Sequence, residues 1–367
     1  MHLDLDVTRR RVIVFGSAAG TRRALRRYQA AGAKVTAVLH GPLPPATELP
    51  DALHLRPMPT PADHHTLLGL IAPAWLVVLI DPPESIGDQV RQLSDQLRIL
   101  LVTEPATAGA GSVTLVGGGP GRTNLLTLAA VEALRDADVV FYDRLAPRDE
   151  LTRLAPGAEL IDVGKSPHHH PVSQTSIEQQ LIDRAKQGLA VVRLKGGDPF
   201  VLGRGGEELQ ACLRAEVPVQ VVPGVSSAVA VPGVAGIPVT HRGIAHSYTV
   251  ISGHVPPSSQ ELRALAALDG TIVILMGIAN LCQIATGLIR AGLDASTPAA
   301  AIERGFSDRE RSTFASLAEL SERVSRLDIQ SPAVIVIGQV VRLAWLGQEA
   351  SVSAGLGSSA ASSWPSA

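Results

Sequence analysis

Short, mainly apolar runs recur along the chain, and several of them open onto a glycine-rich turn. In the first third of the sequence these runs lie at residues 12–16, 34–39, 75–80 and 99–103. Apolar positions at helical spacing lie between them, at residues 21–31 and 86–97. Apolar runs of this length are typical of strands that are buried on both faces of a parallel sheet. Their alternation with helices predicts a small doubly wound α/β domain over residues 1–104.

The same pattern continues beyond residues 105–111, which are rich in Ala and Gly and have the composition of a linker. A helical pattern occupies residues 125–134. Further strand-like runs lie at residues 113–117, 139–142, 190–194, 218–222, 248–251, 271–276 and 333–337. Residues 350–367 contain mostly Ser, Ala and Gly, which predicts a disordered tail.

Composition narrows the class of protein. A length of 367 residues is enough for two or three domains, and 46% hydrophobic with 18% charged residues excludes disorder throughout. A net charge of −2 and an aromatic content of 3% give no basis for binding nucleic acid. No apolar run approaches the ~20 residues of a membrane helix, and the N-terminus lacks the basic region of a signal peptide. We therefore expect a cytoplasmic protein with a small-molecule partner, and with no nucleic-acid or membrane partner.

Cysteine and histidine give no sign of a metal site. Cys212 and Cys282 are too few for a disulfide framework, and neither lies in a CxxC motif, so we expect both to be small buried side chains. His168, His169 and His170 are consecutive, and adjacent side chains do not converge on one ion from regular structure. We expect no bound metal.

The first glycine turn resembles a dinucleotide site only in part. The fingerprint G-x-G-x-x-G, or A at its last position, is matched by Gly16, but Ala18 and Thr21 stand at its second and third glycine positions. No Asp or Glu lies between Val7 and Thr47 to bind ribose hydroxyls. This pattern predicts a degenerate Rossmann-like scaffold and argues against NAD as a cofactor.

Four sequence blocks in the remaining chain are far more specific. They read VGGGPG at 116–121 with YDRL at 142–145, RLKGGDPF at 193–200, VPGVSSA at 222–228 and AGIPVTHR at 235–242. In this order they resemble the uroporphyrinogen-III C-methyltransferases of the tetrapyrrole methylase family, which also form the C-terminal half of siroheme synthase. The resemblance covers residues 112–346. It implies a two-lobed methylase fold, with an N-terminal lobe at 112–222 and a C-terminal lobe at 223–346, behind the Rossmann-like domain.

The activity that this resemblance implies is methylation of uroporphyrinogen III at C2 and C7 by S-adenosyl-L-methionine, which gives precorrin-2 for siroheme or cobalamin. After a methyl group adds to a pyrrole carbon, the ring system must lose a proton, so a nearby carboxylate is useful. Asp143, at the carboxyl end of a predicted strand, matches the family's proton acceptor. Lys165 matches its proton donor.

The resemblance also assigns binding residues. The expected S-adenosylmethionine contacts are Pro120, Gly196, Gly197, Asp198, Val201, Ser226, Ser227, Met276 and Gly305. The substrate carries many carboxylates, so cations should hold it. The candidates are Arg193, Arg204, His241 and Arg242, together with His170, which stands where the family has a histidine. An ion pair with Glu207 or Glu208 is the alternative role for Arg204.

Two other functions remain open at this point. Residues 1–104 faintly resemble the precorrin-2 dehydrogenase half of siroheme synthase, so the chain could be a bifunctional enzyme with an active NAD-dependent domain. It could also methylate another corrinoid intermediate. The family resemblance further implies a homodimer.

Overall fold

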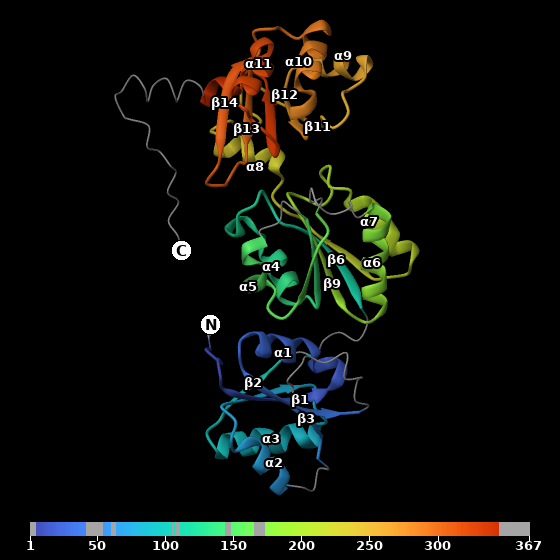
Figure 1. The fold of residues 1–367 in the computed structure, drawn as a ribbon, viewed down its shortest axis with the longest axis vertical. Helices are drawn as coiled ribbons and strands as arrows, with labels where there is room; N and C mark the ends of the chain where they lie inside the picture. The colour runs from blue at the N-terminus through green and yellow to red at the C-terminus, as the bar shows by residue number, and fades with distance from the viewer. Residues whose placement is uncertain are drawn as a thin grey trace, which may run out of the picture. The chain divides into compact units, whose positions relative to one another are not determined.

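Three five-stranded sheets, each covered by helices, make up the part of the chain that the structure describes (Figure 1). The computed structural model describes residues 5–41, 54–59, 64–104, 106, 111–143, 148–164 and 173–344. The first compact unit contains Met1–Gly117, Thr127–Phe200 and Arg204–Pro223. The second contains Gly118–Leu126, Val201–Gly203 and Gly224–Ala367. Two of the sheets belong to the first unit and one belongs to the second.

The first sheet is entirely parallel and has the order β3-β2-β1-β4-β5, which is the order of a doubly wound nucleotide-binding fold. Its strands are β1 (Arg11–Ser17), β2 (Lys34–His40), β3 (His54–Pro57), β4 (Leu76–Ile80) and β5 (Leu100–Thr103). Its helices are α1 (Ala18–Ala30), α2 (His64–Ile71) and α3 (Glu84–Gln96). Alternate residues of β1 serve the two faces: Val12 and Val14 pack toward α1, whereas Ile13 and Phe15 pack toward α2 and α3.

The turn from β1 into α1 is filled by protein atoms. Ser17 caps α1 and accepts a hydrogen bond from the Gly20 amide at 3.0 Å. Thr21 is fully buried, and its hydroxyl donates to the carbonyl of Ser17 at 2.8 Å. A Cβ at Gly16 would lie 2.6 Å from Cγ2 of Thr21. The side chain at the third fingerprint position therefore packs tightly against the glycine that begins this turn.

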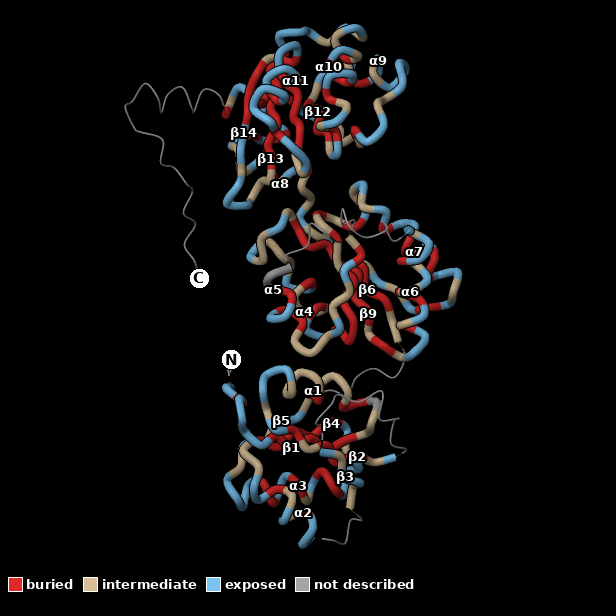
Figure 2. The backbone as a smooth tube through the Cα atoms, viewed as in Figure 1, coloured by how far each residue is buried: buried red, intermediate tan, exposed pale blue. Residues whose placement is uncertain are grey.

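The second sheet is also parallel and has the order β10-β6-β9-β7-β8. Its strands are β6 (Ser112–Gly117), β7 (Val139–Tyr142), β8 (Glu159–Asp162), β9 (Ala190–Lys195) and β10 (Val219–Val222). The surrounding helices are α4 (Leu128–Arg135), α5 (Arg148–Leu154), α6 (Gln174–Lys186) and α7 (Gly205–Arg214). α6 and α7 cover the face that carries Phe141 and Val191, and α4 packs on β6. Buried segments follow β6 and β9 through the middle of this layer (Figure 2).

The third sheet is mixed and has the order β11-β12-β15-β13-β14. Its strands are β11 (Tyr248–Ser252), β12 (Thr271–Leu275), β13 (Pro298–Glu303), β14 (Arg311–Ser316) and β15 (Ala333–Ile337). Its helices are α8 (Ser227–Val234), α9 (Ser259–Ala267), α10 (Leu281–Arg290) and α11 (Leu317–Arg326). α9, α10 and α11 enclose the core on one face, and α8 with residues 340–344 encloses it on the other. Because β12 and β13 are both antiparallel to β15, their carboxyl ends lie at the same edge of the sheet.

These sheets confirm the predicted α/β class with a Rossmann-like first domain. The residues predicted as separate lobes, 112–222 and 223–346, each carry one sheet, although Gly118–Leu126 and Val201–Gly203 group with the second unit. Cys212 is buried as expected, but the same expectation is wrong for Cys282, which is exposed because it lies on the outer side of α10. The predicted tail at 350–367 lies outside the described residues.

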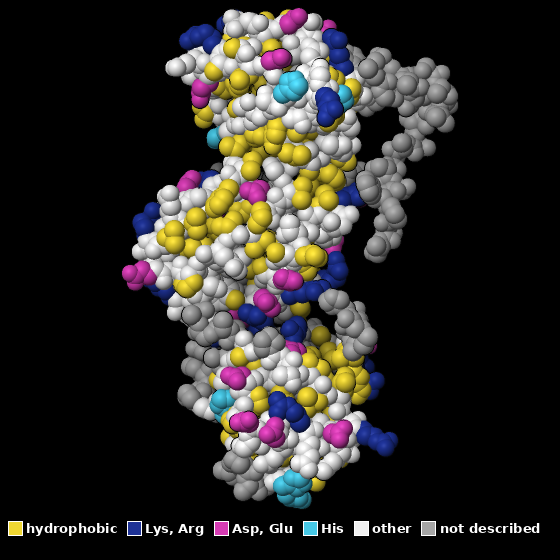
Figure 3. Space-filling model, turned by 180° about the vertical axis from the view of Figure 1, so that it is seen from behind, with side chains coloured by type: hydrophobic (Ala, Val, Ile, Leu, Met, Phe, Trp, Pro, Cys, Tyr) yellow, Lys and Arg dark blue, Asp and Glu magenta, His cyan; other side chains and the backbone are white. Residues whose placement is uncertain are grey.

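The surface and the helices bear on the expected partners. On the face shown in Figure 3, the Lys and Arg side chains of described residues are interspersed with Asp and Glu, in keeping with the net charge of −2. Within the described part of the chain, no helix combines the length and apolar character needed to cross a membrane.

Candidate functional site

The carboxyl edge of the second sheet brings the predicted proton acceptor to a glycine turn. Asp143 directly follows β7, and Gly196 directly follows the neighbouring strand β9. Because the two strands are parallel, both residues lie at the same edge. Oδ2 of Asp143 accepts a hydrogen bond from the Gly196 amide at 3.3 Å, and its side chain is 28% exposed. The carboxylate is thus held by the backbone while it remains accessible to a small molecule.

The turn after β9 is shaped by its own residues. Gly197 has a φ of 68°, in the left-handed region that favours glycine. Oδ1 of Asp198 accepts a hydrogen bond from the Phe200 amide at 2.8 Å, which closes the turn behind it. Asp198 therefore has a structural role in this turn beside its predicted role in cofactor binding.

A buried cluster of charged side chains lies beneath this turn. Arg193 and Lys195 alternate with Leu194 on β9, so both point to the face covered by α6 and α7, where Glu208 of α7 is fully buried. Oε1 of Glu208 accepts hydrogen bonds from Arg193 Nε at 3.1 Å and from Lys195 Nζ at 3.0 Å. Its Oε2 lies 2.9 Å from Lys195 Nζ. Nη2 of Arg193 stands 3.9 Å from Oδ2 of Asp143.

Burial sets the chemistry of Lys195 in this cluster. Desolvation lowers the pKa of its ammonium group, and the positive charge of Arg193 lowers that pKa further. Glu208 and Asp143 act in the opposite direction and raise it. The two carboxylates thus favour the charged form of the buried Lys195 side chain.

Arg204 makes the ion pair that the sequence left as its alternative role. It occupies the N-cap position of α7 with a φ of 59°, and its guanidinium donates to Glu207 at 3.0 and 2.6 Å. This hydrogen bonding raises the pKa of Arg204 and lowers the pKa of the Glu207 carboxyl. Both side chains are more than half exposed, so this ion pair is weak and Arg204 is accessible to other anions.

In the second unit, two predicted cofactor residues lie at one edge of the third sheet. Met276 follows β12, has a φ of 58° and is 48% exposed, and Gly305 lies just after β13. A Cβ at Gly305 would lie 2.7 Å from Cγ1 of Val231 on α8. α8 begins with Ser227, and the Ser226 side chain caps it by accepting a hydrogen bond from the Ala228 amide at 3.3 Å. Close packing of the third sheet against α8 therefore requires glycine at 305.

Contacts with Gly253 and Asn280 hold the turn that carries Met276. The Gly253 amide donates to the Leu275 carbonyl at 2.8 Å, and a Cβ at Gly253 would lie 2.4 Å from Cα of Gly277. Nδ2 of Asn280 donates to the Gly253 carbonyl at 2.9 Å. The exposed thioether of Met276 consequently projects from a rigid backbone.

Other predicted residues take less constrained positions. Pro120 and Val201 are half-buried in the second unit, and Pro120 lies between Gly119 and Gly121, which both have positive φ. His241 and Arg242 are exposed, and His241 closes a small turn through its backbone with Ala245. The predicted proton donor and the predicted loop histidine, Lys165 and His170, lie outside the described residues.

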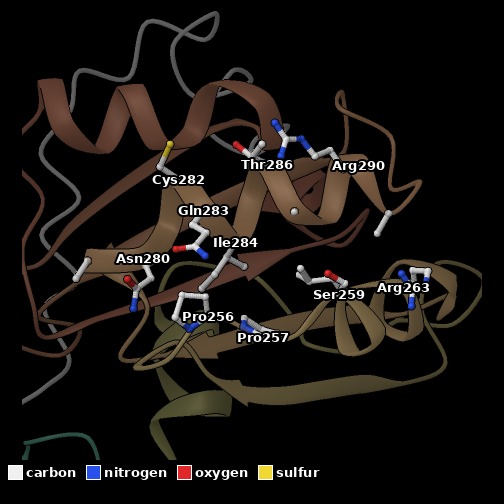
Figure 4. A pocket seen from close by; sticks show the side chains of 14 residues that line it. Pro256, Pro257, Ser259, Arg263, Asn280, Cys282, Gln283, Ile284, Thr286 and Arg290 are labelled. Atoms are coloured by element: carbon white, nitrogen blue, oxygen red, sulfur yellow. The ribbon is translucent and has the colours of Figure 1, made fainter.

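A groove of about 690 Å³ opens between α9 and α10 in the second unit (Figure 4). Arg263, Arg290 and Gln283 supply polar groups, and Pro256 and Ile284 supply apolar ones. None of the predicted site residues that the structure describes lines it. Among the described His, Cys, Asp and Glu side chains, no group of three or more is arranged to hold a metal ion.

Lys195 was not predicted as a site residue, and Glu208 was named only as a possible partner of Arg204, whereas it pairs with Arg193 and Lys195. The signal that could have found them is the alternation of Arg193 and Lys195 within an otherwise apolar strand, since a buried strand that carries two cations requires a buried acid. The helix that follows supplies two candidates, Glu207 and Glu208, and only the second faces the sheet.

Comparison with known proteins identifies the family. A family model described as Tetrapyrrole (Corrin/Porphyrin) Methylases matches residues 112–321, which is more than half of the chain. The S-adenosyl-L-methionine-dependent uroporphyrinogen III methyltransferase of Methanosarcina barkeri is 44% identical over 237 residues, covering 64% of this chain and 93% of that protein. A siroheme synthase of Chromobacterium violaceum is 42% identical over 237 residues, and the chain spans about half the length (50%) of that relative.

A solved structure gives the same assignment. The uroporphyrin-III C-methyl transferase of Thermus thermophilus, whose crystal structure is a complex with S-adenyl homocysteine, is 42% identical, with a TM-score of 0.56. The match covers 64% of this chain and 100% of that one. With the sequence blocks, the parallel second sheet and the glycine turn beside Asp143, these comparisons show that the chain belongs to the tetrapyrrole (corrin/porphyrin) methylase family.

Proposed function

We propose that the chain transfers methyl groups from S-adenosyl-L-methionine to C2 and C7 of uroporphyrinogen III and thereby forms precorrin-2. The observation that carries this proposal is an accessible carboxylate, Asp143, bound to the Gly196 amide at the carboxyl edge of a parallel sheet. It occurs in a chain 44% identical to a relative named as a uroporphyrinogen III methyltransferase.

The described residues suit S-adenosylmethionine, which when bound supplies a methyl group on a positively charged sulfur. In the first unit, Gly196 and Asp198 are partly exposed in the turn after β9, and Gly197 between them is buried and has a positive φ. We assign the first-unit contacts with the nucleoside to this turn. In the second unit, the exposed thioether of Met276 can pack on an adenine ring. We assign the remaining contacts to Pro120, Val201, Ser226, Ser227 and Gly305.

Asp143 is the group to which we assign proton removal. When a methyl group adds to a pyrrole carbon, a new carbon–carbon bond forms, the sulfonium becomes a thioether, and the ring takes up the positive charge. Loss of a ring proton to a carboxylate discharges that charge and restores the conjugated system. The Gly196 amide fixes Oδ2 of Asp143, which leaves the carboxylate oriented for this transfer. Lys165 is the proposed proton donor.

The substrate's carboxylates need cationic partners. Arg204, His241 and Arg242 are exposed, which supports direct contact with an anionic substrate. Arg193 is only 5% exposed and donates to Glu208, which supports a role behind the site more than direct contact. We assign His170 to the same anionic ligand on the family resemblance alone, and on that basis we also propose a homodimer in the cytoplasm.

The alternative of an active NAD-dependent dehydrogenase domain is less well supported. Ser17 and Thr21 fill the turn at the end of β1, where a dinucleotide needs open backbone. Titration with NAD, followed by an assay of precorrin-2 oxidation, tests this domain directly. Clear turnover would overturn our interpretation of residues 1–104.

The test of the proposed function is an assay of the full chain with uroporphyrinogen III and S-adenosylmethionine, followed by the absorbance of the methylated product. We expect the wild type to form precorrin-2 and Asp143→Asn to lose about 100-fold or more in kcat, as is typical for removal of a general base. Asp162→Asn is the matched control, because Asp162 ends the neighbouring strand β8 and binds the Gly164 amide at 2.8 Å. A folded but inert wild type would refute the proposal.

A further inference from the structure

In the second unit, one arginine side chain joins two loops that lie far apart in the sequence. Nε of Arg122 donates a hydrogen bond to the carbonyl of Phe306 at 2.7 Å, and both residues belong to that unit. Arg122 lies two residues after Pro120, and Phe306 directly follows Gly305. Pro120 and Gly305 are both cofactor residues in the proposed function. The hydrogen bond therefore connects two segments of one proposed site.

We infer that Arg122 is a positioning residue for S-adenosylmethionine: by holding the Phe306 carbonyl, it keeps the backbone at Gly305 in the conformation that receives the cofactor. This inference rests on the proposed function, in which Pro120 and Gly305 contact S-adenosylmethionine. Arg122 acts through the Phe306 carbonyl and not through a contact of its own with the cofactor.

The backbone on either side of Gly305 is unfavourable by itself. Arg304 has a φ of 48° and Phe306 has a φ of 68°. Both values lie in the left-handed region, which residues other than glycine rarely adopt. Such residues keep this conformation only where the surrounding structure fixes it. The position of the Gly305 backbone therefore depends on the contacts that hold its two neighbours.

Those contacts differ on the two sides of Gly305. The Arg304 carbonyl accepts hydrogen bonds from the Ser307 amide at 3.0 Å and from the Ser307 hydroxyl at 2.7 Å, which are both neutral groups. The Phe306 amide donates to Oε2 of Glu310 at 2.7 Å, and the Phe306 carbonyl accepts from the Arg122 guanidinium. Hydrogen bonds to charged groups are roughly twice as strong as neutral ones. Charged side chains therefore fix Phe306.

Arg122 is itself anchored in the loop that carries Pro120. Its carbonyl accepts a hydrogen bond from the Leu125 amide at 3.1 Å, which starts the short 3-10 helix η2 (Thr123–Leu125). A Cβ at Gly119 would lie 3.1 Å from the Leu125 carbonyl oxygen, so the glycine-rich turn packs closely on this helix. The half-buried Arg122 side chain thus extends from a well-supported backbone. Its loss would release the turn after β13 from this support.

Two substitutions at position 122 separate the hydrogen bond from the charge. In Arg122→Gln, the side-chain N–H group lies the same number of bonds from the backbone as Nε of arginine, and the charge is absent. Arg122→Met has a similar length and no donor. Arg309→Met is the control for loss of a positive charge in the same loop, because Arg309 is exposed and contacts Ser307 through its amide.

The measurement is calorimetric titration of the full chain with S-adenosylmethionine. We expect Arg122→Met to weaken binding about tenfold, and Arg122→Gln to stay within about threefold of the wild type. Arg309→Met should stay within about twofold. Glu310→Ala removes the other charged partner of Phe306 and should weaken binding about fivefold or more with Arg122 in place.

The methylation assay gives a second reading. In Arg122→Met, the KM for S-adenosylmethionine should rise about tenfold while kcat at saturation stays within about twofold, because the lost interaction acts on binding. A role in stability alone would lower the unfolding temperature and leave the affinity of the folded protein unchanged.

Four outcomes would overturn the inference. An unchanged affinity in folded Arg122→Met or in folded Glu310→Ala would show that the turn does not need these supports. Equal losses in Arg122→Gln and Arg122→Met would assign the effect to the charge. Loss of folding in both variants at position 122 would make Arg122 a residue of stability alone.

The binding measurement also separates this inference from the proposed function. A wild type that binds S-adenosylmethionine but forms no precorrin-2 would refute the proposed function, while the role of Arg122 in binding could still be measured. A wild type that does not bind S-adenosylmethionine would refute both.

Discussion

Glu207 and Glu208 are neighbours in the sequence and have opposite environments in the structure. Glu207 is exposed and pairs with Arg204, whereas Glu208 is fully buried and binds two cations of β9. The sequence could predict that one of them pairs with Arg204, but not which one. The phase of α7 depends on where the helix begins, and it begins after Arg204 adopts a left-handed backbone conformation. The role of Asp143 as proton acceptor stays a prediction that rests on the family motif, and the structure shows only its contact with the Gly196 amide.

Gly305 allows a test of whether a predicted cofactor residue also serves the fold. In Gly305→Ala the new Cβ would lie 2.7 Å from Val231, so we expect the second unit to lose about 1–3 kcal/mol of stability and to bind S-adenosylmethionine more weakly. Hydrogen exchange in β13 measures the stability, and calorimetry measures the binding. Gly233→Ala in α8 is the control, because a Cβ added at Gly233 would meet no atom within 4 Å outside the backbone of its own helix. This substitution should be neutral or slightly stabilising.

The double variant Gly305→Ala/Val231→Ala separates the two roles of Gly305. Removing the Val231 methyl groups should relieve the overlap and recover part of the stability. We expect the affinity for S-adenosylmethionine to stay weak, because the proposed contact is made by Gly305 itself. Full recovery of the affinity would remove Gly305 from the proposed cofactor site.

The two cysteines should differ in reactivity. Burial raises the pKa of the Cys212 thiol from 9.0 to about 11, and Cys282 is exposed. At pH 7.5 we expect a disulfide reagent to label Cys282 alone, and Cys282→Ser to leave no fast-reacting thiol until the protein unfolds. The folded state keeps the Cys212 proton between pH 9 and 11, where the unfolded chain has lost it, so this contribution to stability decreases as pH rises through that range.

At the scale of elements, the apolar runs in the sequence predicted the positions of most strands. The strand β13, which they missed, has a sequence that explains why. β1, β2, β4, β6, β7 and β9 all lie within a residue or two of the predicted runs. β13 was not predicted, because its sequence PAAAIE is rich in alanine, which has low strand propensity, yet all six of its residues are buried. Its partner β14, RSTFAS, has mainly polar residues toward its start. Burial between two neighbours in the mixed sheet decides the conformation of β13.

Helix capping gives a prediction at this scale. Ser258 and Glu261 form a capping box at α9: Ser258 accepts from the Glu261 amide at 3.3 Å, and Glu261 accepts from the Ser258 amide at 2.7 Å. Ser258→Ala should cost about 1 kcal/mol, measured by hydrogen exchange in α9. Ser316→Ala is the control and should cost less, because the Ser316 side chain makes no cap to the α11 backbone.

The capping box should also depend on pH. Its hydrogen bonds lower the pKa of the Glu261 carboxyl from 4.5. The stability from Glu261 is therefore present above pH 4.5 and is lost as pH falls through the lowered value. The effect of Ser258→Ala on α9 should accordingly shrink in strong acid. An effect that grows as the pH falls would contradict this account.

For the whole molecule, the family model matches residues 112–321 and so does not include the first sheet. The match to the Methanosarcina barkeri protein covers 93% of that protein with 64% of this chain, so a methyltransferase of that length needs no counterpart of residues 1–104. The doubly wound class of the first domain was predicted from its strand and turn pattern, and the structure supplies the strand order. The packing of Thr21 against Gly16 was not predicted, because it depends on the side-chain conformation at the helix start.

Removal of the first sheet tests this division of the chain. A variant that begins at Ser112 should fold and retain kcat/KM for uroporphyrinogen III methylation within about threefold of the full chain, a difference of under 1 kcal/mol in transition-state stabilisation. Its Asp143→Asn form is the inactive control. A much larger loss in the folded variant would show that residues 1–104 contribute to the methyltransferase site.

The second unit is built from three separate stretches of the chain, and this affects when it can fold during synthesis on the ribosome. Nε of Arg122 donates to the Phe306 carbonyl at 2.7 Å, across 184 residues of sequence. At the usual synthesis rate of about 5–20 residues per second, the arginine waits about 10–40 seconds for its partner to emerge. Residues 118–126 leave the ribosome well before the rest of their unit, whereas α1 can pack on β1 almost at once. The first sheet can therefore mature early in translation, and the second unit is completed only after the residues that follow Gly224 have been synthesised.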